Sequence, residues 1–463
     1  MYDLVIHNAK VVTEKGIVEA NLAILDGKIA NILPVMAECE EPSQLPESKE
    51  VIDAKGCYLL PGGVDAHTHL DMPLSNGLKS ADDFVSGTIA AAVGGTTTVI
   101  DYACQDANGT LMEALTEWKK KAKGACVDYG MHMSIVRADD QTLSEMADMV
   151  SQGVTSFKTY LVYDMRLSDE ELYRVLERSA NLGTIVTVHC ENYGVLQYRT
   201  KKLLAEGKCE PKYHAVSRPD RCEGEAVNRV LQISAMADMA PVYIVHNTCR
   251  ESIKCIEESR SMGHPVFAET CPQYLLLDDS KYELEPEECV KYVMSPPLRS
   301  KADQHYLWEA LKNGTVKVVA TDHCPFSLAE KKRGLHNFTE IPNGGTGVEE
   351  RIPLMYSEGR KHGLSYVEIA KLTATNPAKL FGMYPRKGTI RIGSDADLVL
   401  YDPDKTVTIT HDILHENVDY TCYEGMTVEG YPVMTLLRGQ ILAKDGSFTG
   451  KMGQGQYVRR DLP

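Results

Sequence analysis

Eight short apolar segments alternate with helix-like segments between about residue 58 and residue 322, and this alternation constrains the fold more than any other feature. Short buried strands separated by helices are typical of βα units, which pair in parallel within one sheet. Eight such units close into a (β/α)8 barrel. We therefore predict an α/β fold, a TIM barrel with strands at Leu59 to Asp65, Thr97 to Tyr102, Tyr129 to Ile135, Ser156 to Tyr160, Ile185 to His189, Val242 to His246, Val266 to Thr270 and Val318 to Asp322.

Both ends of the chain show a different pattern, of short strands separated by turns. Near the start these are "LVIHNAKVV" and "NLAILDGKIANIL", with Asp26-Gly27 as a hairpin turn, and near the end "KGTIRIGSDADLVLYDP" and "VMTLLRGQILAKDGSF". We predict a second, smaller β-sandwich domain built from residues 1–55 and 385–463, beside a barrel of residues 56–384. The acidic, proline-containing stretch at 37–50 is predicted to be an exposed loop.

The composition excludes several classes of partner. A formal net charge of −16 disfavours nucleic acid and anionic membranes. No window reaches the roughly 18 apolar residues of a membrane helix, and the first residues lack the pattern of a secretion signal. Thirteen cysteines without a CxxC pair do not suggest a disulfide framework. We expect a cytoplasmic protein in a reducing compartment.

Two histidines, His67 and His69, follow the apolar run of "LLPGGVDAHTHLDMP". Residues i and i+2 of a strand face the same side, about 6.8 Å apart along it. Both imidazoles can therefore reach one metal ion. Taken alone the HxH motif is weak, because it also occurs by chance.

Four further candidate ligands fall at or near the predicted carboxyl ends of later strands: Lys158, His189, His246 and Asp322. In a (β/α)8 barrel these ends converge on one face, where active sites lie. A strand-end histidine is more often a hydrogen-bonded core residue, and Asp322 could cap a helix. Since only 14 residues are histidine and four occupy equivalent positions, the joint pattern predicts a metal site. His132 and His323 are interpreted as structural.

Lys158 is unusual in this set, because an ammonium is costly to bury and cannot coordinate a cation. Reaction with CO2 would convert the amine into a carbamate, an anion able to bridge two metals. Two divalent ions among four neutral histidines and one aspartate also require further negative charge. Zinc is favoured by these ligands, although manganese, cobalt or nickel would also fit.

Nine stretches of the sequence, which include the candidate ligands, carry a resemblance to a known family. In chain order they are "PGGVDAHTHLDMP", "GGTTTVIDY", "SFKTYLVY", "HCEN", "YIVH", "ETCPQYLLLD", "SPPLR", "VVATDHCPF" and "NGGTGVEER". With them, essentially the whole chain resembles the dihydropyrimidinase and D-hydantoinase family of cyclic amidohydrolases. The resemblance implies a carbamylated Lys158 bridging two divalent metals, with His67, His69 and Asp322 on one and His189 and His246 on the other.

The same resemblance implies hydrolysis of a cyclic ureide to an N-carbamoyl amino acid. Asp322 would carry the proton, and Tyr163, five residues after the lysine, would bind substrate and stabilise the oxyanion. Backbone groups at Ser295 and Asn343 would hold the ring amides. From the residues alone, Ser295 could simply begin a loop before two prolines, and Asn343 suits a turn. By analogy we expect a homo-oligomer, a tetramer in which the C-terminal "GQGQYVRR" reaches a neighbouring subunit.

The departures from the family pattern concern the substrate. After the lysine this chain reads "LVYDMRLSD" where the family usually has "MAYK", and the stretch in this chain is closer to that of phenylhydantoinases. The motifs "HCEN" and "VHNT" also differ from the commoner forms in the family. Dihydroorotase and allantoinase are alternatives, but Asp71 stands where a dihydroorotase has arginine, and the allantoinase continuation after HxH is missing. A metal-dependent deaminase or phosphotriesterase-like hydrolase is a further alternative. Non-catalytic interaction proteins of the family lack the ligands that this chain retains.

Overall fold

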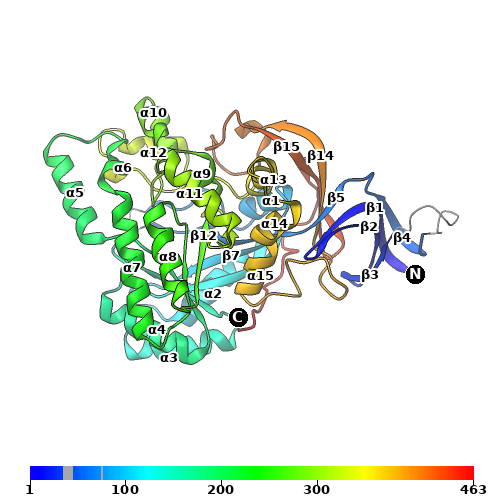
Figure 1. Ribbon diagram of the computed structural model, residues 1–463, viewed down its shortest axis with the longest axis horizontal. Coiled ribbons are helices and arrows are strands. Elements are labelled where there is room, and N and C mark those ends of the chain that lie inside the picture. The colour runs from blue at the N-terminus through cyan, green and yellow to red at the C-terminus, as the bar shows by residue number, and fades with distance from the viewer. Residues whose placement is uncertain (35–44, 75–76, 463) are drawn as a thin grey trace.

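The computed structural model describes residues 1–34, 45–74 and 77–462, and the chain builds two β-sheets, one of them surrounded by helices (Figure 1). Residues 37–44 of the predicted exposed loop lie outside the described residues. An eight-stranded sheet in the order β13-β12-β11-β10-β9-β8-β7-β6 forms the barrel, and a nine-stranded sheet lies beside it. This arrangement confirms the predicted α/β barrel with a second β unit, whereas the exact domain boundaries stay predictions.

The barrel strands pair in parallel, each with its neighbour in sequence. They are β6 (Gly63–Thr68), β7 (Thr96–Cys104), β8 (Asp128–Ser134), β9 (Ser156–Tyr160), β10 (Ile185–His189), β11 (Val242–Ile244), β12 (Val266–Thr270) and β13 (Val318–Val319). Strands such as "IVTVH" of β10 are buried along their whole length, because helices cover one face and the barrel interior the other.

The first predicted strand was placed too early in the chain. Residues Tyr58–Pro61 form β5 of the nine-stranded sheet, where they pair with β1 and β14, and the barrel strand begins only at Gly63. Gly62 lies between them, and a Cβ there would come within 2.2 Å of the Thr97 side chain. The apolar run "YLLPGGV" thus contains two strands of different sheets, which its uninterrupted hydrophobicity conceals.

Hydrogen bonds between the first and last strands close the barrel at the level of the candidate ligands. The Asp322 amide donates to the His67 carbonyl at 2.9 Å, and the His69 amide donates to the His323 carbonyl at 2.9 Å. Residues 67–69 and residues 322–323 therefore face each other through main-chain contacts. Barrel closure and the position of three candidate ligands depend on the same few residues.

A helix follows each barrel strand, as in βα units. Helix α4 illustrates why: Ser168 and Glu171 form a capping box at its start, Gly183 ends it at φ 68°, and Leu172, Val175 and Leu176 form its buried face. The α-helices are α1 (Ser86–Val93), α2 (Leu111–Lys121), α3 (Asp140–Ser151), α4 (Asp169–Leu182), α5 (Tyr193–Ala205), α6 (Tyr213–Ser217), α7 (Asp220–Met236), α8 (Arg250–Ser261), α9 (Pro272–Leu276), α10 (Pro286–Cys289), α11 (Lys301–Lys312), α12 (Leu328–Lys331), α13 (Arg351–Lys361), α14 (Tyr366–Ala370) and α15 (Asn376–Leu380).

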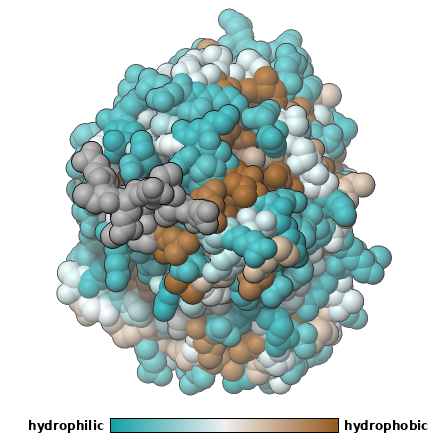
Figure 2. Space-filling view, turned by 90° about the vertical axis from the view of Figure 1, so that its right-hand side faces the viewer, coloured by the Kyte–Doolittle hydropathy of each residue, from teal (hydrophilic) through white to brown (hydrophobic). Residues whose placement is uncertain are grey.

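The nine-stranded sheet combines both ends of the chain, in the order β17-β16-β15-β14-β5-β1-β2-β3 with β4 paired to β1. Apolar side chains from β1, β2, β14 and β15, including Leu22 and Leu398, share one buried core. Its strands are β1 (Tyr2–Thr13), β2 (Gly16–Leu25), β3 (Lys28–Pro34), β4 (Ser48–Asp53), β5, β14 (Leu398–Thr408), β15 (Thr427–Leu437), β16 (Gln440–Lys444) and β17 (Ser447–Phe448). On the face seen in Figure 2, hydrophobic residues form small patches among hydrophilic ones.

The C-terminal segment packs against this chain's own barrel, whereas the contact of "GQGQYVRR" with a neighbouring subunit stays a prediction. The Tyr129 amide donates to the Gln456 carbonyl at 3.0 Å, and the Val458 amide donates to the Tyr129 carbonyl at 2.7 Å. Arg460 is only 3% exposed and donates to the Ser156 hydroxyl at 2.8 Å. These contacts attach the segment to β8 and β9.

A buried ion cluster joins the two units. The Lys387 ammonium lies 2.5 Å from Asp128 of β8, 3.0 Å from Asp395 and 2.6 Å from Asp397, which precedes β14.

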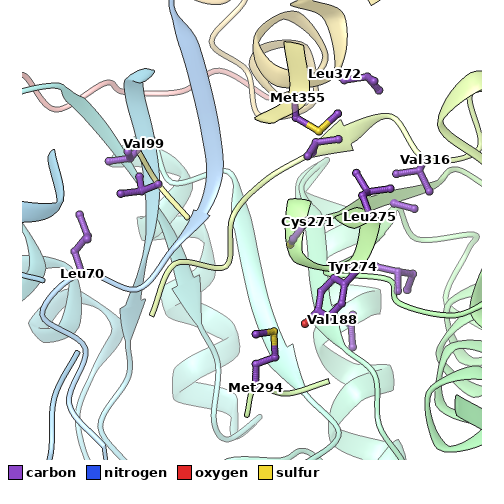
Figure 3. Close-up of a cluster of buried hydrophobic side chains, with 14 of the residues drawn as sticks. Leu70, Val99, Val188, Cys271, Tyr274, Leu275, Met294, Val316, Met355 and Leu372 are labelled. Carbon is purple, nitrogen blue, oxygen red and sulfur yellow. The ribbon is translucent and has the colours of Figure 1, made fainter. Parts of the chain in front are cut away.

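The largest apolar core surrounds the barrel, with Leu70 and Val99 on one side and Cys271 and Leu275 on the other (Figure 3). Over the described ranges, no helix has the length and hydrophobicity required to cross a membrane.

Candidate metal centre

The six candidate ligands lie at the carboxyl ends of the barrel strands or just beyond them. His67 is in β6 and His69 follows it, Lys158 is in β9 and His189 ends β10, while His246 and Asp322 come two and three residues after β11 and β13. All except Asp322 are less than 10% exposed, and the Asp322 side chain retains 16%. The structure therefore brings together at one end of the barrel all six residues that the sequence selects.

His67, His69 and Asp322 form the first group. The two Nε2 atoms lie 3.2 Å apart, and Asp322 Oδ1 is 3.1 Å from that of His67 and 3.0 Å from that of His69. Three ligand atoms of different side chains thus converge on one point. Two imidazoles and a carboxylate in this arrangement are a common donor set for zinc and related divalent ions.

His189 and His246 form the second group, with His189 Nδ1 2.9 Å from His246 Nε2. The His246 ring is 5.5 Å from that of His67, which places the two groups side by side. The Lys158 ammonium lies 4.9 Å from the centre of the Tyr102 ring, which also packs on His67 and His69 at 4.8 and 5.1 Å. Lys158 therefore lies beside the first group, on the same aromatic ring.

The hydrogen bonds of the rings test whether these residues suit a metal. The His189 Nε2 atom is 2.8 Å from Glu191, and His67 Nδ1 contacts Glu269, so the carboxylates accept the outer N–H groups. In the neutral rings the inner nitrogens, His67 Nε2 and His189 Nδ1, present lone pairs that face other ring nitrogens, although Glu269 and Asp322 outweigh the lowering effect of burial and raise the pKa of His67 to about 9. Such lone pairs repel unless a proton or a cation lies between them, and the donor set accordingly fits metal ions.

The electrostatics of the site also follow from burial and close charges. Burial lowers the pKa of the Lys158 amine to about 8, although Asp322 and Glu269 raise it. Burial raises the pKa of Asp322, but the imidazoles of His67 and His69 outweigh this effect and hold it well below its usual range. Asp322 is therefore a carboxylate at neutral pH, and about a tenth of Lys158 is a neutral amine there, far more than for an ordinary lysine.

Three of the candidate residues have left-handed backbone conformations: Tyr163 at φ 68°, His246 at φ 37° and Asp322 at φ 54°. For residues with a Cβ such conformations cost about 1–3 kcal/mol and cluster at functional sites. The strain is compensated by the surrounding hydrogen bonds, such as the Asp322 amide to the His67 carbonyl. These conformations direct the side chains out of the strand direction and into the site.

Sequence reasoning assigned no role to Glu269 and Glu191, although both lie in quoted motifs. Glu269, in β12, contacts His67 Nδ1, accepts the His246 amide at 3.1 Å and accepts the Tyr243 hydroxyl at 2.6 Å. It is fully buried and connects the two ligand groups. A signal was present, because a carboxylate near the end of a buried barrel strand requires a partner inside the barrel.

We predict that Glu269→Gln lowers metal affinity by about 10- to 100-fold, as expected when a carboxylate that orients a ligand histidine is lost. The two oxygens of Glu269 accept from the His67 ring and from the Tyr243 hydroxyl, whereas a glutamine amide has only one acceptor oxygen. Metal retained after dialysis against a graded chelator measures the effect. Glu416→Gln, another buried glutamate whose burial raises its pKa well above normal, is the control and should retain metal like the unmodified protein. Equal metal retention in both variants would contradict the role of Glu269.

The three predicted substrate residues also lie at this end. The Tyr163 ring is 5.4 Å from that of His189, and burial raises the pKa of its phenol to about 12, against the opposing effects of Arg218 and Ser295 beside it. Tyr163 is therefore a neutral donor, with Ser295 as its neighbour. The Asn343 Oδ1 atom is buried and has no hydrogen-bond partner among the residues that the structure describes.

His132 and His323 make the contacts expected of structural histidines. His132 bonds the Ser156 hydroxyl at 2.6 Å and the Ala66 carbonyl at 3.0 Å. His323 lies 2.9 Å from Asp82 and points away from the ligand groups, towards the segment around Glu416. Neither ring is directed at the point where the ligand atoms converge.

Comparison with known proteins agrees with this geometry. The model of the Amidohydrolase family matches residues 58–442. The D-hydantoinase of Geobacillus stearothermophilus is 45% identical over 98% of this chain and 96% of its own length, and the D-phenylhydantoinase of Escherichia coli O81 is 40% identical over 99% and 98%. The crystal structure of dihydropyrimidinase from Brevibacillus agri, 44% identical, superposes with a TM-score of 0.95 over 99% of this chain and 98% of that one. With the barrel and its histidines, these matches show that the chain belongs to the amidohydrolase family.

Proposed function

We propose that this protein is a metal-dependent hydrolase that opens the cyclic amide of 5-monosubstituted hydantoins or dihydropyrimidines to give N-carbamoyl amino acids. The observation that carries the proposal is the convergence of His67, His69, His189, His246 and Asp322, with Lys158 beside them, at one end of the barrel. The full-length similarity to D-hydantoinases supports the same reaction.

His67, His69 and Asp322 would hold one divalent ion, and His189 and His246 a second, with Lys158 between them. Zinc is the favoured ion for these donors. Bound divalent ions would supply Lewis acidity and lower the pKa of water, so that hydroxide is available near neutral pH. The protein's contribution is to fix the ligands, through Glu269 and Glu191, before any substrate arrives.

Lys158 would serve as a carbamate. Its neutral amine would attack the carbon of CO2, a nitrogen–carbon bond would form and one proton would leave, giving one negative charge shared by two oxygens at the end of the side chain. Two features support this proposal: burial lowers the pKa of the amine to about 8, and the lysine is close enough to His67 and His189, one from each histidine group, for its charge to oppose the protonation of both. A permanently charged ammonium at this place would oppose cation binding instead.

The reaction needs one proton carrier and one oxyanion donor, and the geometry offers both. Asp322, ionised and partly exposed towards the open end of the barrel, would take a proton from the attacking water and deliver it to the leaving ring nitrogen. The neutral phenol of Tyr163 would donate to the oxygen of the attacked carbonyl as charge develops there. Main-chain groups at Ser295 and Asn343 would hold the ring amides.

Asp71 bears on the choice among cyclic substrates. Its carboxylate lies 2.7 Å from the Lys79 ammonium and 3.6 Å from that of Lys121, so it is already paired within the chain. A carboxylated ring would meet another carboxylate where a dihydroorotase presents arginine. The loops at 70–79 and 160–170 would determine substrate width; residues 75–76 of the first loop lie outside the described part.

A panel of dihydrouracil, 5-phenylhydantoin, unsubstituted hydantoin and allantoin, assayed with metal analysis, tests the proposal. We expect turnover of 5-phenylhydantoin or dihydrouracil that is lost on chelation and restored by zinc, manganese or cobalt, and little turnover of allantoin. Product formation is followed by loss of ring absorbance and by detection of the carbamoyl group. Inactivity on all four compounds with two metals bound per chain would refute the cyclic-ureide assignment.

We also propose a cytoplasmic homo-oligomer, a tetramer by family analogy. The cysteines of the described ranges are all free, which suits a reducing compartment. Helix α5 exposes the apolar side chains of Val195 and Tyr198, at 45% and 70%, and it lies at the outer edge of the barrel (Figure 1). Light scattering of the purified protein measures the mass directly, and a monomer would contradict the proposal.

A further inference from the structure

Two main-chain segments meet beside the candidate site, one leading to Ser295 and the other to Asn343. The Gly344 amide donates to the Val293 carbonyl at 3.2 Å, and the Cys324 amide donates to the Gly345 carbonyl at 3.1 Å, two residues after Asp322. Gly344, at φ 148°, leaves no space for a side chain, since a Cβ would lie 2.1 Å from the Cys324 carbonyl oxygen. The separation of Ser295 and Asn343 therefore depends on how these segments are joined.

Lys331, the last residue of α12, joins them through its side chain. Its ammonium donates to the Val293 carbonyl at 2.9 Å and to the Pro342 carbonyl at 3.1 Å. The two acceptors lie two residues before Ser295 and one residue before Asn343. One buried cation thus binds both segments immediately before the residues that the proposed reaction needs.

The charge of Lys331 has no acidic counterpart. Its side chain is fully buried, and within the described ranges no carboxylate lies at ion-pair distance from it. Lys387, the comparable buried lysine, is instead surrounded by three aspartates at the junction of the two units. Burial lowers the pKa of Lys331 to about 8. A lysine that served only the stability of the fold would be expected beside carboxylates, as Lys387 is.

The other side chains on the first segment hold it at single points. His214 bonds the Met294 carbonyl at 2.9 Å, and the Tyr274 hydroxyl donates to the Pro296 carbonyl at 2.9 Å; Met294 and Tyr274 are seen in the lower part of Figure 3. Neither contact reaches the Asn343 segment. The Lys331 ammonium, by contrast, donates to a carbonyl of each segment.

We propose that Lys331 is a positioning residue that sets the distance between the Ser295 and Asn343 main-chain groups, and thereby the affinity for the ring amides. The inference rests on the proposed function. Because ring amides are held alike in the ground state and the transition state, loss of this bridge raises KM more than it lowers kcat. Lys331 touches neither the candidate ligands nor the reacting atoms, so metal content does not depend on it.

The test is Lys331→Met, which retains the length of the side chain but not its donors, compared with Lys387→Met as the matched buried-lysine control. For Lys331→Met we expect KM for the best cyclic ureide of the panel to rise at least about tenfold, with kcat changed less than about threefold and metal content unchanged. Lys387→Met should lower the unfolding temperature and leave KM unchanged. Lys331→Gln, with an amide that still reaches one carbonyl, should give an intermediate KM.

The outcomes separate the two proposals. If the unmodified protein opens no cyclic ureide, the proposed function fails. If it is active but Lys331→Met and Lys331→Gln have its KM, the positioning role is wrong while the function stands. A similar rise of KM in Lys387→Met would show a general effect of instability and would also overturn the inference. Should Lys331→Met not fold, the KM of Lys331→Gln decides.

Discussion

Replacing Lys158 by alanine is expected to reduce ring opening at least about a thousandfold, because the proposed carbamate bridge between the two ligand groups and its negative charge would be lost together. Metal content should fall with activity, since four neutral imidazoles and one carboxylate cannot balance two divalent ions. Turnover of the preferred cyclic ureide and metal analysis of the same sample measure both effects.

Short carboxylic acids provide the sharper test of the Lys158 prediction. Acetate or propionate can occupy the space left by the lysine and present two oxygens where the carbamate would lie, so part of the activity and metal should return with the acid. Lys158→Met is the matched control, because its side chain fills that space and leaves no room for the acid. Normal metal content and turnover in Lys158→Ala would disprove the bridging role.

The second large effect is expected for Asp322→Asn, which retains the size of the side chain and one possible ligand oxygen but cannot accept a proton. We expect kcat to fall about 100- to 10,000-fold, the range typical of a lost general base. Asp322 is held ionised by His67 and His69, so it is available as a base throughout the neutral range. The fall should therefore persist as pH is raised.

Asp128→Asn is the control for Asp322→Asn. Asp128 is a fully buried carboxylate at the start of β8, bonded to Lys387 and Arg438 at the junction of the two units, whereas the ligands lie towards the opposite ends of the strands. Its replacement should lower stability and leave turnover per folded molecule unchanged. An Asp322→Asn variant that keeps both metal and turnover would show that another group carries the proton.

The barrel could be predicted from sequence because its strands are short, uninterrupted apolar runs, and a strand buried on both faces has no other composition available. Strands such as Ser156–Tyr160 and Ile185–His189 have the predicted bounds. The run from Tyr58 was misassigned because hydrophobicity reports burial and not the sheet in which a strand is buried. Only the pairing of β5 with β1 and β14 distinguishes the two sheets.

The candidate ligands could be selected because rare residue types recurred at equivalent strand ends. Glu269 and Lys331 could not, for different reasons. Glu269 acts through a contact with His67, about two hundred residues away, that no local spacing reveals. Lys331 lies in a polar stretch, "LAEKKRG". The neighbouring lysine, Lys332, is partly exposed and forms an ion pair with Glu287 on the surface. Which of two adjacent lysines turns inward depends on tertiary packing.

The attachment of the C-terminal segment to β8 has a consequence for the order of events during synthesis. Gln456 donates to Asp128, 328 residues earlier in the chain, and Arg460 reaches Ser156 of β9. A ribosome must therefore add most of the chain before these two strands acquire all their contacts, and contacts so distant in sequence slow folding. Nascent chains interrupted after β13 should remain dependent on chaperones, although every barrel strand has by then been translated.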